Sequence, residues 1–143
     1  GFGKVKGSFW SFHYHKHHKR TTKGRGVDRT YLEESFYGKE LVALVLLGAI
    51  HIPLLWANAV FAITIIVYLL AYYYAHTKAH MDVGWSKKWL PWHYDHHMGY
   101  PESNWGVLLP ITDIVAGTRK HYLGTQKYYR DELKRGNYLV YEN

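Results

Sequence analysis

An uncharged run from Leu41 to Thr77 constrains the fold of this chain more than any other feature of the sequence. As one straight helix, these 37 residues would extend about 55 Å at about 1.5 Å per residue. The hydrocarbon core of a bilayer is about 30 Å thick. Two helices therefore fit better, with a break at 56–58, shortly after Pro53. We predict an all-α membrane protein whose transmembrane helical hairpin covers about residues 37–56 and 58–80.

The alternative for this run is a buried hairpin in the core of a soluble protein. Nearly every position is apolar, so neither helix has the amphipathic face that a soluble helix shows. The eighteen Lys and Arg residues all lie outside the run, nine in 1–40 and nine in 78–143. The positive-inside rule then predicts a multi-pass chain with both termini on the cytoplasmic or equivalent side. A bacterial inner membrane, the endoplasmic reticulum and a mitochondrial membrane all agree with these signals.

Histidine is the second feature of the chain. Nine of its eleven histidines form three clusters, namely His13, His15, His17 and His18, then His76 and His80, then His93, His96 and His97. A solvated basic patch has no need of histidine, because Lys or Arg carries a more reliable charge, whereas imidazole is the commonest metal ligand. The chain has no cysteine, so any metal would be bound through nitrogen or oxygen.

The spacing within the clusters selects eight of these side chains. His76 and His80 are four residues apart on a predicted helix and share a face. The third cluster has the spacing His-x-x-His-His, which also places its three side chains on one face of a helix. The first reads His-x-x-x-His-His if His13 is followed by His17 and His18, and His15 then points elsewhere or substitutes for one of them. Eight imidazoles exceed the four of a tetrahedral zinc site and match two metals with three or four ligands each.

At this point the sequence resembles the fatty acid hydroxylase / sterol desaturase superfamily of integral-membrane, histidine-rich di-iron oxygenases. The resemblance rests on WSFHYHKHH at 10–18, HTKAH at 76–80, HYDHH at 93–97 and NWGVLLPITDIVAGT at 104–118. It implies an oxidoreductase (a monooxygenase of lipid metabolism) that hydroxylates or desaturates a fatty acyl chain, sterol or related lipid with O₂. It also implies the metal ligands His13, His17, His18, His76, His80, His93, His96 and His97, with His15 as an extra candidate.

The resemblance further implies two iron ions as cofactor. Zinc is a substitute to consider, because imidazole also suits Zn, Cu and Ni. No glycine-rich nucleotide- or flavin-binding motif occurs in the sequence. We therefore expect a separate electron donor of the cytochrome b5, ferredoxin or rubredoxin type. Asn104 and Asp113 are candidates for groups that orient the imidazoles, against the alternatives of a turn residue and a helix cap.

One departure from the family leaves a second function open. The family usually has an earlier His-x-x-x-His on a preceding membrane helix, and no such motif precedes the first cluster here. We expect one domain over 1–143 that is either a fragment without its N-terminal membrane helices or a reduced form. A reduced form would be an inactive structural subunit among other membrane subunits. A basic nucleic-acid or anionic-lipid module around residues 13–25 is a third alternative, but it leaves the other clusters unexplained, so we expect no nucleic-acid partner.

Three further expectations concern single segments and residues. Segment 85–92 contains three Trp residues, which favour a membrane interface. Residues 126–135 read as a short terminal helix with Gly136 near its end. His51, inside the first apolar helix, is expected to hydrogen-bond the partner helix as a neutral ring, and His121 to lie on the basic surface.

Overall fold

The computed structural model describes residues 4–8, 11, 13–28, 30–33 and 39–136. The regular elements within these ranges are all helical. They are η2 (His13–His18), α1 (Lys19–Lys23), α2 (Thr30–Glu33), α3 (Lys39–His51), α4 (Leu54–Ala57), α5 (Ala59–Met81), α6 (Val83–Trp89), α7 (Pro91–Met98), α8 (Ile111–Val115) and α9 (Gln126–Lys134).

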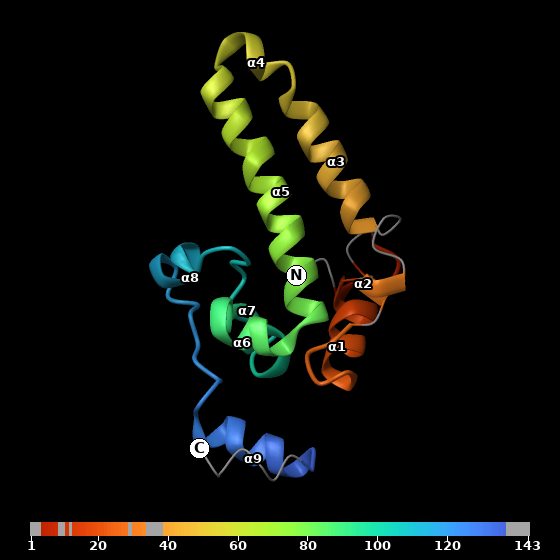
Figure 1. Cartoon of the computed structure of the whole chain (residues 1–143), viewed down its shortest axis with the longest axis vertical. Helices are drawn as coiled ribbons and strands as arrows, with labels where there is room; N and C mark the ends of the chain where they lie inside the picture. The colour runs from red at the N-terminus through yellow and green to blue at the C-terminus, as the bar shows by residue number, and fades with distance from the viewer. Residues whose placement is uncertain (1–3, 9–10, 12, 29, 34–38, 137–143) are drawn as a thin grey trace.

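Helices α3 and α5 form an elongated apolar arm, with α4 connecting them at the end far from the other helices (Figure 1). With 23 residues, α5 is long and apolar enough to cross a membrane by length and composition. Its apolar side chains face outward, with Val67 58% exposed, and α3 exposes Val45, Leu46 and Ile50 in the same way. The arm therefore presents an apolar surface to its surroundings over most of its length.

The first arm helix is shorter than the sequence predicts. It was expected to reach residue 56, but α3 ends at His51. Pro53 explains the difference, because proline disfavours a helical conformation in the residue before it and has no N–H to donate. The chain becomes helical again in α4, directly after Pro53. The predicted start at residue 37 lies outside the described residues.

Polar side chains fix both ends of α5. Asn58 is extended, and its Oδ1 accepts a hydrogen bond from the Phe61 N–H at 3.0 Å, which caps the helix as expected for this residue type. Asp82 ends α5 in an extended conformation, and its Oδ1 accepts from the Trp85 N–H at 2.9 Å. One residue thus stops α5 and caps α6, so the chain turns back beneath the end of the arm.

The remaining helices gather around the inner end of α5 (Figure 1). Small residues make this approach possible, because Ala75 and Ala79 of α5 pack against Leu90, which precedes α7. A second buried cluster contains Tyr94, Met98, Tyr122 and Tyr128. It attaches α9 to α7. The helix predicted for residues 126–135 is confirmed, because α9 covers Gln126–Lys134 and ends at Arg135.

Candidate metal centre

Three helices supply the eight histidines that the sequence singles out. His76 and His80 lie one turn apart at the inner end of α5, and His93, His96 and His97 come from the adjacent α7. His13, His17 and His18 come from η2, a π-helical turn. Of the eight, His13 is partly exposed and the others are buried.

The π-helical turn explains the extra residue in the first cluster. On an α-helix, at about 100° per residue, His18 would lie about 140° around the axis from His13. The wider turn of η2 bonds residue i to i+5 and brings these two positions onto one face. The ring of His13 accordingly lies 5.1 Å from that of His17 and 5.0 Å from that of His18, between centroids.

The rings form two adjacent groups, each with metal-ligand spacing. His17, His76, His80 and His97 form one group, and His13, His18 and His96 form the other. Within each group the nitrogens nearest the centre lie within 4.8 Å of one another. The groups adjoin, because the rings of His97 and His18 are 4.5 Å apart.

His93 completes the set of eight. Its Nε2 lies 3.1 Å from Nε2 of His80 in the first group. Its ring is stacked on that of His96, in the second group, at 6.4 Å between centroids. The structure thus brings all eight side chains into one cluster. Its two groups have four and three imidazoles, each with spacing that suits the ligands of one metal ion.

The donor set fits metal ions. A tetrahedral metal with bonds of about 2.0–2.1 Å holds its ligand nitrogens about 3.4 Å apart. The Nε2 atoms of His76 and His80 are 3.2 Å apart, and those of His18 and His96 are 3.1 Å apart. In the described part of the chain, no hydrogen-bond partner reaches Nε2 of His17 or either ring nitrogen of His97, although these atoms are buried. Buried polar atoms are costly to leave unpaired, and these nitrogens are available to bind a cation.

Hydrogen bonds on the outer side of three rings orient them toward the centre. Nδ1 of His17 donates to Asp28 Oδ2 at 3.1 Å, and Nδ1 of His76 donates to Glu40 Oε1 at 2.5 Å. Nδ1 of His96 donates to the Ser103 carbonyl at 2.6 Å. Each acceptor lacks a proton to give, so Nδ1 carries the hydrogen and Nε2 keeps its lone pair. Carboxylate–histidine and carbonyl–histidine pairs of this kind hold metal-ligating imidazoles in place.

Burial favours the uncharged form of several of these rings. Desolvation, reinforced by neighbouring histidines, lowers the pKa of His13 to about 3 and that of His18 to about 2. It also holds the pKa values of His93 and His97 well below the usual range. Neutral imidazole is the form that binds metals, so these side chains are ready to act as ligands at pH 7.

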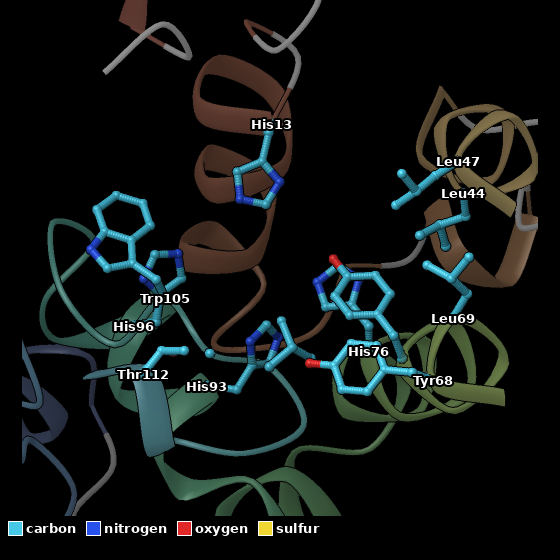
Figure 2. A pocket seen from close by; sticks show the side chains of 13 residues that line it. His13, Leu44, Leu47, Tyr68, Leu69, His76, His93, His96, Trp105 and Thr112 are labelled. Carbon is cyan, nitrogen blue, oxygen red and sulfur yellow. The ribbon is translucent and has the colours of Figure 1, made fainter. Parts of the chain in front are cut away.

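A cavity of about 570 Å³ opens from the cluster toward the arm. Figure 2 shows His13, His93 and His96 at one side of this cavity and the leucines of the arm at the other. The apolar wall consists of Leu44, Leu47 and Leu69, and Trp105, Val107 and Thr112 close it on the side of the α8 segment. An apolar space that ends on a group of imidazoles suits an elongated apolar ligand.

Other residues singled out from the sequence lie outside this cluster. His15, the extra ligand candidate, points away from it, because its side chain is exposed and Nε2 bonds the Lys4 carbonyl at 3.0 Å. His51 does not bond the partner helix as expected, since its Nδ1 donates to Leu47 O in its own helix at 2.7 Å. His121 is exposed beside Arg119, on the basic surface as expected.

Asn104 and Asp113 hold the loop beside the cluster instead of an imidazole. Asn104 Oδ1 accepts from Lys120 N and Arg119 Nη1 at 2.8 and 2.9 Å. Asp113 accepts from the N–H groups of Trp105 and Gly106. These bonds saturate both side chains within the loop, and the described residues show no bond from either to a histidine ring. Asn104 adjoins Ser103, whose carbonyl accepts from His96, and the charge of Asp113 acts on His96 through space.

Several partners of the cluster were not predicted from the sequence. Asp28 and Glu40 belong to no motif in the sequence, and their bonds to His17 and His76 depend on how the helices pack. Asp95 lies inside the His-x-x-His-His motif, where its Oδ2 accepts from Arg119 Nη1 at 2.9 Å and its Oδ1 accepts from Leu123 N at 2.8 Å. The position of Asp95 in the sequence could have predicted this pairing, because a charged residue between buried histidines of one helix must itself be paired.

No protein-family model, no curated protein and no solved structure matches this chain. The residues and their geometry therefore carry the functional argument.

Proposed function

We propose that this chain is a membrane-bound oxygenase with two iron ions, which hydroxylates or desaturates a lipid chain with O₂ and electrons from a separate donor protein. The observation that carries the proposal is the union of two imidazole groups with an apolar cavity that ends on them. The resemblance to fatty acid hydroxylases and sterol desaturases, drawn from the histidine motifs, supports the same reaction class.

The residues for the metals follow from the two groups. His17, His76, His80 and His97 would hold one ion, and His13, His18 and His96 the other, with His93 between the two groups. When bound, the two iron ions would supply the activation of O₂ and the removal of hydrogen from an unactivated C–H bond. Hydroxylation consumes one O₂, two electrons and two protons, and it releases one water.

The side chains of the protein would position the lipid chain and exclude water from the site of reaction. Leu44, Leu47 and Leu69 would contact the lipid chain and direct one of its carbons toward the histidines. Their apolar side chains also exclude water from the reacting carbon. Asp28, Glu40 and the Ser103 carbonyl keep three rings fixed, so the ligands need no rearrangement during turnover.

We further propose that the arm spans the bilayer, with the histidine cluster and both termini on the cytoplasmic or equivalent face. The length and composition of α5 and the outward-facing apolar side chains of both arm helices support this placement. It lets a lipid enter the cavity from the membrane without crossing water. The distribution of Lys and Arg supports the orientation.

The test compares two matched alanine variants of the purified protein. His96→Ala removes a buried ring of the cluster, whereas His15→Ala removes an exposed histidine of η2 that lies two residues from His13 and His17. We expect about two irons per chain in the unaltered protein, from the two groups of imidazoles. We expect lipid oxidation with a chemical reductant, loss of iron and turnover in His96→Ala, and neither loss in His15→Ala.

Full turnover in a preparation without iron would contradict the proposal. A folded chain that binds no metal and purifies in a stable complex with other membrane proteins would instead support the structural-subunit alternative.

A further inference from the structure

A second apolar surface lies outside the arm, on the segment around α8. Five large apolar side chains of this segment face outward, and we call them the α8 patch: Trp105, Leu109, Ile111, Ile114 and Val115. Val115 is 84% exposed and Ile114 is 62% exposed. Contiguous exposed apolar surface of this kind marks a contact with another molecule or with a membrane.

The segment is apolar outside and polar inside, the reverse of a loop in water. Asp113 is the one charged residue between Ser103 and Thr118, and it is buried. Its carboxylate accepts from the N–H groups of Trp105 and Gly106 and from Thr118 Oγ1. The polar groups are thus satisfied internally, as an apolar environment requires.

The cavity fixes the level of the α8 patch relative to the arm. Trp105 and Thr112 line one side of the cavity, and Leu47 and Tyr68 line the other (Figure 2). Tyr68 lies eight residues from His76 along α5, or about 12 Å at about 1.5 Å per residue. In Figure 1, α8 accordingly lies at the height of the lower part of α5 and not near α9.

We infer that the α8 patch is immersed in the same bilayer leaflet as the neighbouring part of the arm. This inference rests on the proposed insertion of the arm. A lipid surface is the fitting occupant because the apolar surface of the arm continues across the cavity mouth to α8, while exposed Lys120 follows the segment and can reach phosphate groups. The cavity then opens between two lipid-immersed walls, and an acyl chain can enter it sideways.

Site-specific labelling tests this placement, because the chain has no native cysteine. Val115→Cys in the α8 patch, Val67→Cys on α5 and Lys134→Cys on α9 would each carry a polarity-sensitive fluorophore. The labelled proteins are reconstituted into phosphatidylcholine–phosphatidylglycerol vesicles with and without doxyl-labelled lipid. Metal content, measured on each variant, verifies that the protein is folded.

We expect blue-shifted emission and quenching by the doxyl lipid at positions 115 and 67, and neither effect at position 134. Quenching at 67 without quenching at 115 would overturn the inference and leave the membrane placement of the arm intact. Absence of quenching at both positions would overturn both. Energy transfer between labels at position 115 of two copies, without lipid quenching, would assign the α8 patch to a dimer and overturn the inference.

Discussion

The Glu40 carboxylate accepts a hydrogen bond from Nδ1 of His76 at 2.5 Å and thereby joins the two helices of the arm at the histidine cluster. Tyr31 donates its hydroxyl to the other oxygen of Glu40 at 2.5 Å. Because Glu40 lies in the first turn of α3 and His76 lies near the inner end of α5, this network couples the packing of the arm to the orientation of one imidazole of the cluster.

Glu40→Gln should weaken metal binding without unfolding the protein. The amide keeps the size and an acceptor oxygen but loses the charge that polarises His76, and losses of such partners typically cost about 10–100-fold in metal affinity. Metal titration of the purified protein in detergent measures the effect. Glu102→Gln is the matched control, because Glu102 is an exposed partner of Lys4. Equal affinities in the two variants would contradict this role of Glu40.

Asp28→Ala should destabilise the metal-free protein by about 1.5–3 kcal/mol, the range for hydrogen bonds to a charged group. The carboxylate bonds His17 and both the N–H and Oγ1 of Thr30. Denaturant unfolding in detergent measures the loss. Asp131→Ala should cost less than about 1 kcal/mol, because Asp131 pairs with Lys127 in a partly exposed bridge on α9. A smaller loss for Asp28→Ala than for Asp131→Ala would refute the prediction.

Arg119→Met should cost about 3–5 kcal/mol, because it leaves the buried Asp95 carboxylate without its cation. Iron content should fall as well, since α7 carries Asp95 together with three of the histidines. Unfolding curves and metal analysis provide the two measurements. Arg130→Met, at an exposed position on α9, should change stability by less than about 0.5 kcal/mol. A stable Arg119→Met protein with full iron would show that Asp95 is held by other contacts.

The metal-free protein should lose stability as the pH falls from 7 to 5. Burial lowers the pKa of His13 to about 3 and that of His18 to about 2, while the unfolded values stay near 6.5. Above pH 6.5 the rings are neutral in both states and have no effect. Below it, the unfolded chain binds protons that the folded chain does not, so the free energy of unfolding decreases toward pH 3.

Denaturant unfolding at pH 7 and pH 5 after chelation measures this dependence. His18→Ala should reduce it, whereas His15→Ala, at an exposed position, should leave it unchanged. Equal stability of the unaltered protein at the two pH values would show that the buried rings accept protons in the folded state.

Leu47→Trp should shorten the cavity and shift turnover toward shorter lipid chains, with iron content unchanged. Leu47 lines the cavity, so the larger indole occupies space that the lipid would use. Leu46→Trp is the matched control, because Leu46 is exposed on the outer surface of α3. Competition between short and long substrates measures the change in preference. The same chain-length preference in both variants would show that the substrate does not bind in this cavity.

Local periodicity predicts much of this centre. The spacing of His76 with His80, and of His93 with His96 and His97, selects rings on one helical face, and the structure brings those rings together. The first cluster could not be predicted from α-helical spacing, which does not align His13 with His18. The π-helical turn of η2 does align them.

Bonds between distant segments were beyond prediction from the sequence. Glu40 reaches His76 across 36 residues of chain, and no local pattern marks either residue as the partner of the other. The outward orientation of the α8 patch was not predicted either, because it depends on the buried hydrogen bonds of Asp113 to distant positions in the loop.

The pairing of η2 with α7 determines when the centre can be completed during synthesis. His18 and His96 are 78 residues apart in the chain, and their group is incomplete until the second has emerged from the ribosome. At about 5–20 residues per second, the first histidines wait about 4–16 s for their partners. Until then, a metal in this group would be held by His13 and His18 alone and would exchange readily. Stable loading of the proposed metal site would therefore be a late event in biogenesis, after the arm has been made.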